Sequence, residues 1–161
     1  MEECVDRVIA FLKQIGITVR EDAVPDDSFL PGVRIEDGCL VLDTARLRWP
    51  GDLLHEAGHL AVTPSARRAF LAGNVESEEA IAAGEVEATA WAYAAVHHLG
   101  LPASVLFHEG GYHGSSSGLI TMFEAGVYPG AFGLAQAGMT EVGPDVPAHR
   151  AYPHMARWLR A

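Results

Sequence analysis

Apolar residues recur at helical spacing near the start of the chain, and the pattern then changes to short runs of strand type. Residues 2–15 place Val, Ile, Phe and Leu three or four positions apart and end at Gly16. This spacing predicts an amphipathic helix. Residues 17–20 read as a short strand, whereas the acidic stretch 21–31, with two prolines, is typical of a loop.

A hairpin is predicted directly after this loop. The runs 33–36 and 39–43 are rich in branched apolar residues, and they flank the dipeptide Asp37-Gly38. Asp-Gly between two such runs is a strong hairpin signal, because both central residues of the turn need a positive φ. The chain therefore predicts a small N-terminal antiparallel sheet.

The next apolar segment, residues 50–62, predicts a buried helix. Pro50 suits the first turn of a helix, and Thr63-Pro64 stands where a helix must end. Leucine and alanine occupy most of the positions between them, so neighbouring elements should enclose this helix. We expect the small sheet to pack on it.

The second half of the chain is predicted to be mostly helical. A long helix is expected up to about residue 98, with Asn74 or Ser77 as its N-cap and Gly100 as its stop. The other expected elements are short helices at 65–73, 103–107, 118–138 (broken at 128–130) and 154–160, with loops at 108–117 and 143–153. Helices outnumber strands, which indicates an α+β fold.

Composition narrows the class of protein. The 161 residues suit a single domain, 1–161. A formal net charge of −10 argues against nucleic acid or an anionic membrane surface as a partner. We see neither a secretory signal nor a membrane-spanning segment, and two cysteines do not make a disulfide framework. We therefore expect a cytoplasmic protein.

The segment His55-Glu56-Ala57-Gly58-His59 carries the candidate chemistry. Two residues four apart lie on one face of a helix, so His55 and His59 can bind one Zn²⁺ together. Glu56 is then placed to take a proton from a zinc-bound water. The alternative is a pair of core histidines beside a buried glutamate, but an unpaired buried carboxylate is costly and no cation lies at i±3 or i±4.

A third ligand is expected from the long helix. Glu85 shares a helical stripe with Ala88, Thr89 and Ala92, whose small side chains would let another helix approach closely. Glu87 lies on a different stripe and is the second candidate. A carboxylate in packed surroundings needs a cation, which a metal would supply.

These residues resemble a known family. His55-Glu56-x-x-His59, followed by Glu85-x-x-Ala88-x-x-Trp91-Ala92, is similar to the gluzincin type of zincin metallopeptidase, and within it to ImmA/IrrE-type proteins. The resemblance covers residues 53–97. It implies a zincin-like fold, His55, His59 and Glu85 as zinc ligands, and Glu56 as the general base.

The chain departs from that family in two respects. Thr89 stands where the family has Asn or Asp, a partner for a ligand histidine, and no helix-turn-helix region is evident. A weaker resemblance is to peptide deformylases, in which a Gly-Cys-Leu segment supplies the third ligand. Gly38-Cys39-Leu40 matches that segment, but its distance from His55 is too short.

The glycine-rich segment 108–114 contains further candidate groups. A zinc hydrolase needs a hydrogen-bond donor for the oxyanion that develops on the substrate carbonyl. Tyr112 or His113 could supply it from a mobile loop. The alternative is a surface loop with solvated histidines.

The sequence thus predicts a zinc-dependent hydrolase, specifically a peptidase acting on a peptide or protein substrate, with Zn²⁺ as its cofactor. Two alternatives stay open. One is a zinc-stabilised regulatory or binding domain without turnover, and the other is a metal-free helical protein with a chance motif. The sequence does not determine the oligomeric state.

Overall fold

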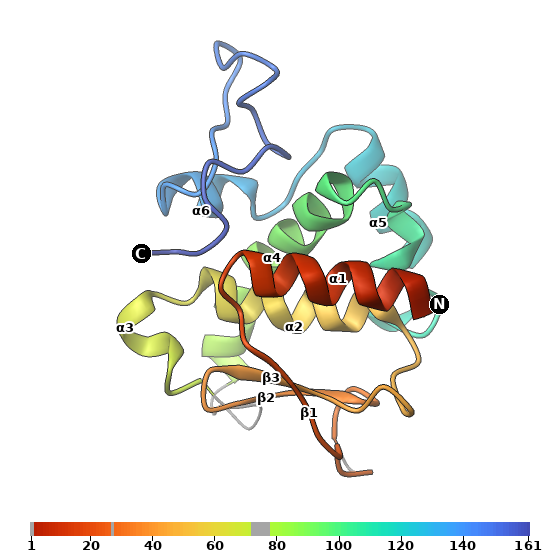
Figure 1. Ribbon diagram of the computed structural model, residues 1–161. Coiled ribbons are helices and arrows are strands. Elements are labelled where there is room, and N and C mark those ends of the chain that lie inside the picture. Colours follow the sequence, from red (N-terminus) through yellow and green to blue (C-terminus); the bar gives the residue numbers. More distant parts are fainter. Residues whose placement is uncertain (1, 27, 72–77) are drawn as a thin grey trace.

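The computed structural model describes residues 2–26, 28–71 and 78–161, and it has an α+β fold (Figure 1). Its elements in chain order are α1 (Glu2–Gln14), β1 (Val19–Glu21), β2 (Val33–Glu36), β3 (Cys39–Leu42), α2 (Pro50–Val62), α3 (Ser65–Arg68), α4 (Glu78–His98), the 3-10 turns η1 (Ala103–Val105) and η2 (Tyr112–Gly114), α5 (Ser116–Glu124) and α6 (Ala131–Gln136). Among the described helices, none is both long and apolar enough to cross a bilayer.

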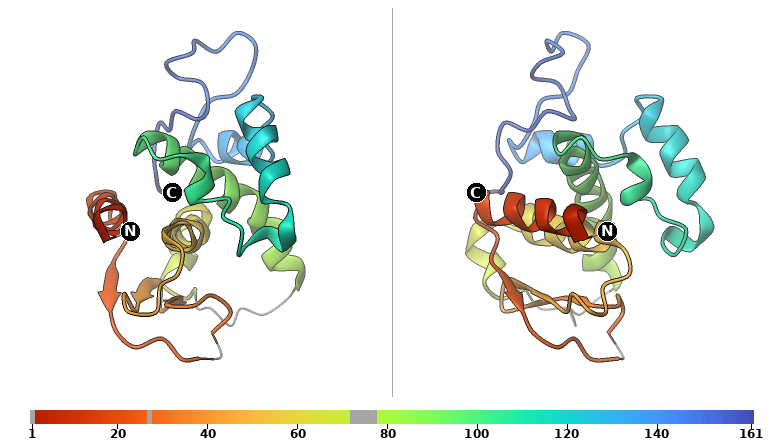
Figure 2. Two further views of the ribbon diagram at one scale, coloured as in Figure 1. Left: turned by 90° about the vertical axis from the view of Figure 1, so that its right-hand side faces the viewer. Right: turned by 45° about the vertical axis from the view of Figure 1, so that its right-hand side comes forward.

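Helix α2 lies at the centre of the molecule. It contacts α1, α4, β2 and β3, and Figure 2 shows α1 and α4 on different sides of it with the sheet below. The helix starts at Pro50 and gives way to extended backbone at Thr63, as predicted. Its leucines and alanines are buried because neighbours enclose it on most sides.

The sheet has the strand order β1-β3-β2. Strands β2 and β3 pair antiparallel, and both turn residues have a positive φ (48° at Asp37 and 73° at Gly38), which confirms the predicted hairpin. Strand β1, however, pairs with β3 in parallel. The sheet is therefore mixed, and the prediction of a wholly antiparallel sheet is wrong. Turn chemistry determines only the pairing of β2 with β3, whereas tertiary packing selects the partner of β1.

The most extensive contact between two elements joins α2 to α4. It is close because the residues that face each other are small. A Cβ atom added to Gly58 would lie 2.5 Å from the carbonyl oxygen of Ala88. The backbones of the two helices therefore meet where Gly58 faces Ala88. Gly58 directly precedes His59 in α2, and Ala88 follows Glu85 by three residues in α4.

We expect Gly58→Ala to destabilise the protein. Overpacking costs about 1–3 kcal/mol, and the gain in helix propensity on replacing glycine by alanine offsets only about 1 kcal/mol of it. Gly84→Ala in α4 is the matched control, since no described atom lies within 4 Å of its Cβ position. Chemical denaturation should show lower stability for the first variant and equal or higher stability for the second. Equal stabilisation by both would contradict the close contact.

Other sequence predictions met different outcomes. The short helices predicted within 118–138 correspond to α5 and α6, separated at the predicted break, but α5 begins at Ser116, within the predicted loop 108–117. The predicted helix 65–73 ends at Arg68, and the predicted caps Asn74 and Ser77 lie outside the described residues. The predicted helix 154–160 is wrong. Only the N–H of His154 bonds locally, to the carbonyl of Ala151, among the bonds of this described segment. The N–H groups of Ala156, Arg157 and Arg160 bond instead to the distant carbonyls of Met139 and Ala61.

Candidate metal centre

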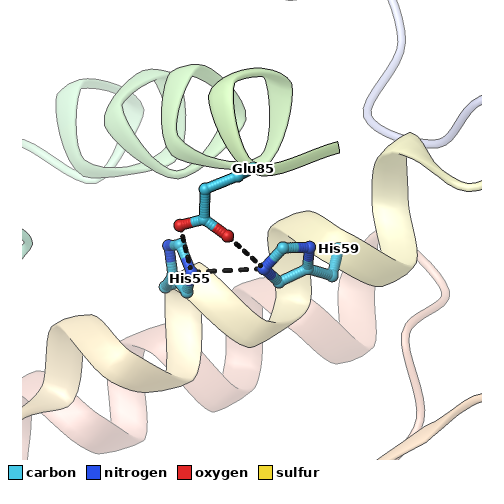
Figure 3. Close-up of side chains that lie close together, drawn as sticks. All are labelled: His55, His59 and Glu85. Carbon is cyan, nitrogen blue, oxygen red and sulfur yellow. Dashed lines mark hydrogen bonds and ion pairs between the residues drawn. The ribbon is translucent and has the colours of Figure 1, made fainter. Parts of the chain in front are cut away.

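Three potential ligand side chains converge between α2 and α4 (Figure 3). His55 and His59 lie one turn apart on α2, and Glu85 reaches them from α4. His55 Nε2 and His59 Nε2 are 3.2 Å apart. Glu85 Oε1 lies 3.1 Å from His55 Nε2, and Glu85 Oε2 lies 3.3 Å from His59 Nε2. Of the two candidate third ligands, Glu85 is therefore the one that joins the histidines.

These separations fit a shared metal ion. Ligand atoms at zinc bond lengths of 2.0–2.2 Å in a tetrahedral arrangement lie about 3.3–3.6 Å from one another. The distance between the two imidazole nitrogens is 3.2 Å, and each of them lies 3.1–3.3 Å from one of the two Glu85 oxygens, so all three distances are at or slightly below that range. Two imidazole nitrogens with one carboxylate are also a donor set that zinc accepts in catalytic sites.

The number of protons available on the two imidazoles also favours a bound metal ion. The two Nε2 atoms carry at most two protons, which can serve the two contacts with Glu85. The Nε2–Nε2 contact between His55 and His59 would then bring two N–H groups together without an acceptor. A cation shared by all three side chains removes this conflict, because each then presents a lone pair. The residues therefore fit a divalent metal.

The surroundings of Glu85 favour the ionised form of its carboxyl, which is the form that binds a metal. Burial raises the pKa of its carboxyl, but hydrogen bonds from His55 and His59 and their charge outweigh burial, and the pKa lies well below its usual value. Burial lowers the pKa of His55, and the hydrogen bond and charge of Glu85 more than reverse this. The Glu85 side chain is 42% exposed, so the group is accessible from solvent on one side.

Glu56 lies beside the group and has no ion-pair partner among the described residues. Burial raises the pKa of its carboxyl, and the charges of His59 and His55 counteract this only in part. A carboxylate with a raised pKa accepts a proton more readily than an ordinary glutamate does.

The predicted loop places one of its two candidate donors near the metal group. The ring of Tyr112 approaches His55 edge-on, with centroids 6.2 Å apart. Burial, with the carboxylates of Glu85 and Asp52, raises the pKa of Tyr112, so its hydroxyl stays protonated at neutral pH. His113 is exposed and has left-handed backbone with φ 51°. The structure thus favours Tyr112 over His113 as a group near the site.

A second pair of polar side chains holds this loop against α2. His108 Nε2 lies 2.8 Å from Asp52 Oδ1, and both residues are buried. The indole of Trp49 stacks on the His108 ring, with centroids 4.6 Å apart, and the Ser116 hydroxyl donates to the His108 carbonyl. These contacts attach the segment 108–116 to the first turn of α2 and so hold Tyr112 near the ligands.

The remaining candidates lie away from the ligand group. A Cβ atom on Gly133 of α6 would lie 2.3 Å from Glu87 Oε1, so Glu87 faces α6. Cys39 is a free thiol in β3 and is not one of the clustered ligands found among the described residues. Thr89 makes no hydrogen bond to a histidine in the described part of the chain, and His55 Nδ1 is buried there without a partner.

Comparison of the chain with protein-family models, with curated proteins and with solved structures found no match. The support for a metal centre is therefore the ligand geometry itself. The resemblance to zincins, which rests on the motif residues, stays a prediction.

Proposed function

We propose that this chain is a zinc-dependent peptidase with a zincin-like fold. The observation that carries the proposal is the group of His55, His59 and Glu85, whose ligand atoms all lie within 4.8 Å of one another, with Glu56 beside it. These three residues would hold the ion. When bound, zinc polarises a substrate carbonyl and lowers the pKa of water, which makes hydroxide available at neutral pH.

Glu56 supplies the proton transfer in this proposal. Its carboxylate accepts the proton that the attacking water loses, and the protonated carboxyl then delivers it to the nitrogen of the leaving amine. Its raised pKa suits both steps, because the group has to hold the proton between them. A surface glutamate with an ordinary pKa would lose the proton to solvent more readily.

Tyr112 has the second role. Attack on a peptide carbonyl places negative charge on its oxygen, and a protonated hydroxyl can donate a hydrogen bond to it. Tyr112 stays protonated at neutral pH and lies next to His55, so we assign this role to Tyr112 in preference to His113. The pair of Asp52 and His108 keeps the loop in place.

The experiment is reconstitution of the metal-free chain with one equivalent of zinc, followed by incubation with a degenerate peptide library. Mass spectrometry should detect new peptide termini with zinc, and none after removal of the metal with a chelator. Binding of zinc without any cleavage would support the zinc-stabilised regulatory domain instead. Failure to bind zinc at all would contradict both functions.

A further inference from the structure

A cavity of about 190 Å³ lies directly beside the metal group. Glu85 and Tyr112, which both belong to the candidate centre, form part of its wall. The other residues that line it come from α4, from α5 and from the segment before α6, and they are Val86, Thr89, Leu119, Phe123 and Pro129. The cavity therefore adjoins two residues of the candidate centre.

The size of the cavity limits what it can accept. Sites for whole small molecules usually measure about 300–1,000 Å³, which is clearly larger. An apolar cavity of about 150 Å³ is known to accommodate benzene. The space beside Glu85 therefore matches one side chain of the size of leucine, methionine or phenylalanine.

The lining of the cavity limits the chemistry of its occupant. Apart from Glu85, Tyr112 and Thr89, the described residues of the wall are apolar, and none of these described residues carries a positive charge. An acidic group would therefore find no cation to pair with among the described residues of the wall. A polar side chain placed here would lose water and gain few hydrogen bonds. An uncharged apolar side chain is the occupant that this surface favours.

We infer that this cavity is a specificity pocket, which receives an apolar side chain of the peptide substrate next to the bond that is cleaved. The inference rests on the proposed function for its substrate. It adds the class of residue that the site selects, and it assigns Val86, Leu119 and Phe123 as the residues that select it.

The test uses capped amino-acid hydroxamates, because the hydroxamate group binds zinc and no turnover is needed. Derivatives of leucine, phenylalanine, glycine and aspartate are titrated calorimetrically into the zinc-loaded full chain. We expect the leucine and phenylalanine derivatives to bind about 10- to 100-fold more tightly than the glycine derivative, from burial of one apolar side chain. The aspartate derivative should bind most weakly. Equal affinity for all four would overturn the inference.

Two variants that fill the cavity and one control test whether the preference for leucine over glycine arises there. Val86 is 44% exposed and lines the cavity, so Val86→Trp should fill the cavity with little loss of stability. It should remove the preference for leucine over glycine. Val127 is 55% exposed and does not line the cavity, so Val127→Trp should keep the preference. Leu119→Trp provides a second filling variant. A preference that survives in both filling variants would contradict the assignment.

A further measurement separates this inference from the proposed function. The metal-free chain is titrated with N-acetyl-leucinamide and N-acetyl-glycinamide and followed by NMR. Shifts at Leu119 and Phe123 with the leucine compound alone support the pocket even if the zinc-loaded chain binds no hydroxamate, in which case only the proposed function fails. Identical responses to the two compounds would overturn the pocket.

Discussion

Replacing Glu56 by glutamine is expected to reduce the rate of zinc-dependent peptide cleavage by about 10²- to 10⁴-fold, the usual contribution of a general acid–base group. Glutamine has nearly the same shape as glutamate but cannot accept the proton at neutral pH. Glu56 is not one of the three clustered ligands, so zinc should still bind at one ion per chain. Cleavage rate and metal content, measured on the same preparation, check both parts of this prediction.

A matched control excludes a general effect of lost charge. Glu124→Gln makes the same change at an exposed position at the end of α5, and it should leave the cleavage rate unchanged. Since burial disfavours the ionised form of Glu56, the metal-free Glu56→Gln variant should also be at least as stable as the wild-type chain at neutral pH. Full activity in the Glu56→Gln variant would refute its role as the base.

Replacing Glu85 by glutamine should weaken zinc binding by more than about 100-fold. Loss of a group that merely supports a ligand already costs about 10- to 100-fold in metal affinity, and Glu85 is a ligand itself in this proposal. Glu87→Gln makes the same change two residues along α4, in a side chain that faces α6, and should leave zinc affinity unchanged. Competition with a chromogenic chelator measures both affinities. Equal losses in the two variants would contradict the assignment.

Thermal unfolding provides an independent measure of the same site. Free zinc at 100 times its Kd should stabilise the wild-type chain by about 2.7 kcal/mol. This corresponds to a rise in Tm of roughly 5–11 °C for a chain of this size. Glu85→Gln and His55→Ala should lose most of this rise, whereas Glu87→Gln should retain it. Zinc that leaves the wild-type Tm unchanged would contradict a bound ion in the native state.

The features that could be predicted from sequence are those with a local signal. Pro50 and Thr63-Pro64 bound α2 through backbone constraints that act within a few residues. Asp37 and Gly38 define their hairpin for a similar reason. The helical phase of Glu85 placed it on the face that meets α2, because small residues on the same stripe allow the helices to approach closely.

The features that could not be predicted depend on distant partners. Strand β1 pairs with a strand that follows it by about twenty residues, and its short sequence carries no sign of direction. The pair of Asp52 and His108 spans 56 residues, and neither residue has a local pattern that marks it as buried. The cavity beside Glu85 likewise combines residues from four separate segments, so periodicity within any one segment could not reveal it.

Because Gly58 and Ala88 bring α2 and α4 into close contact, zinc binding can be used to follow the docking of these two helices during folding. An isolated α2 offers two imidazoles, and the carboxylate joins them only once α4 has docked. During refolding, tight uptake of zinc therefore marks the moment at which these two helices associate. A metal-sensitive dye in a stopped-flow experiment would time that association relative to formation of the rest of the core.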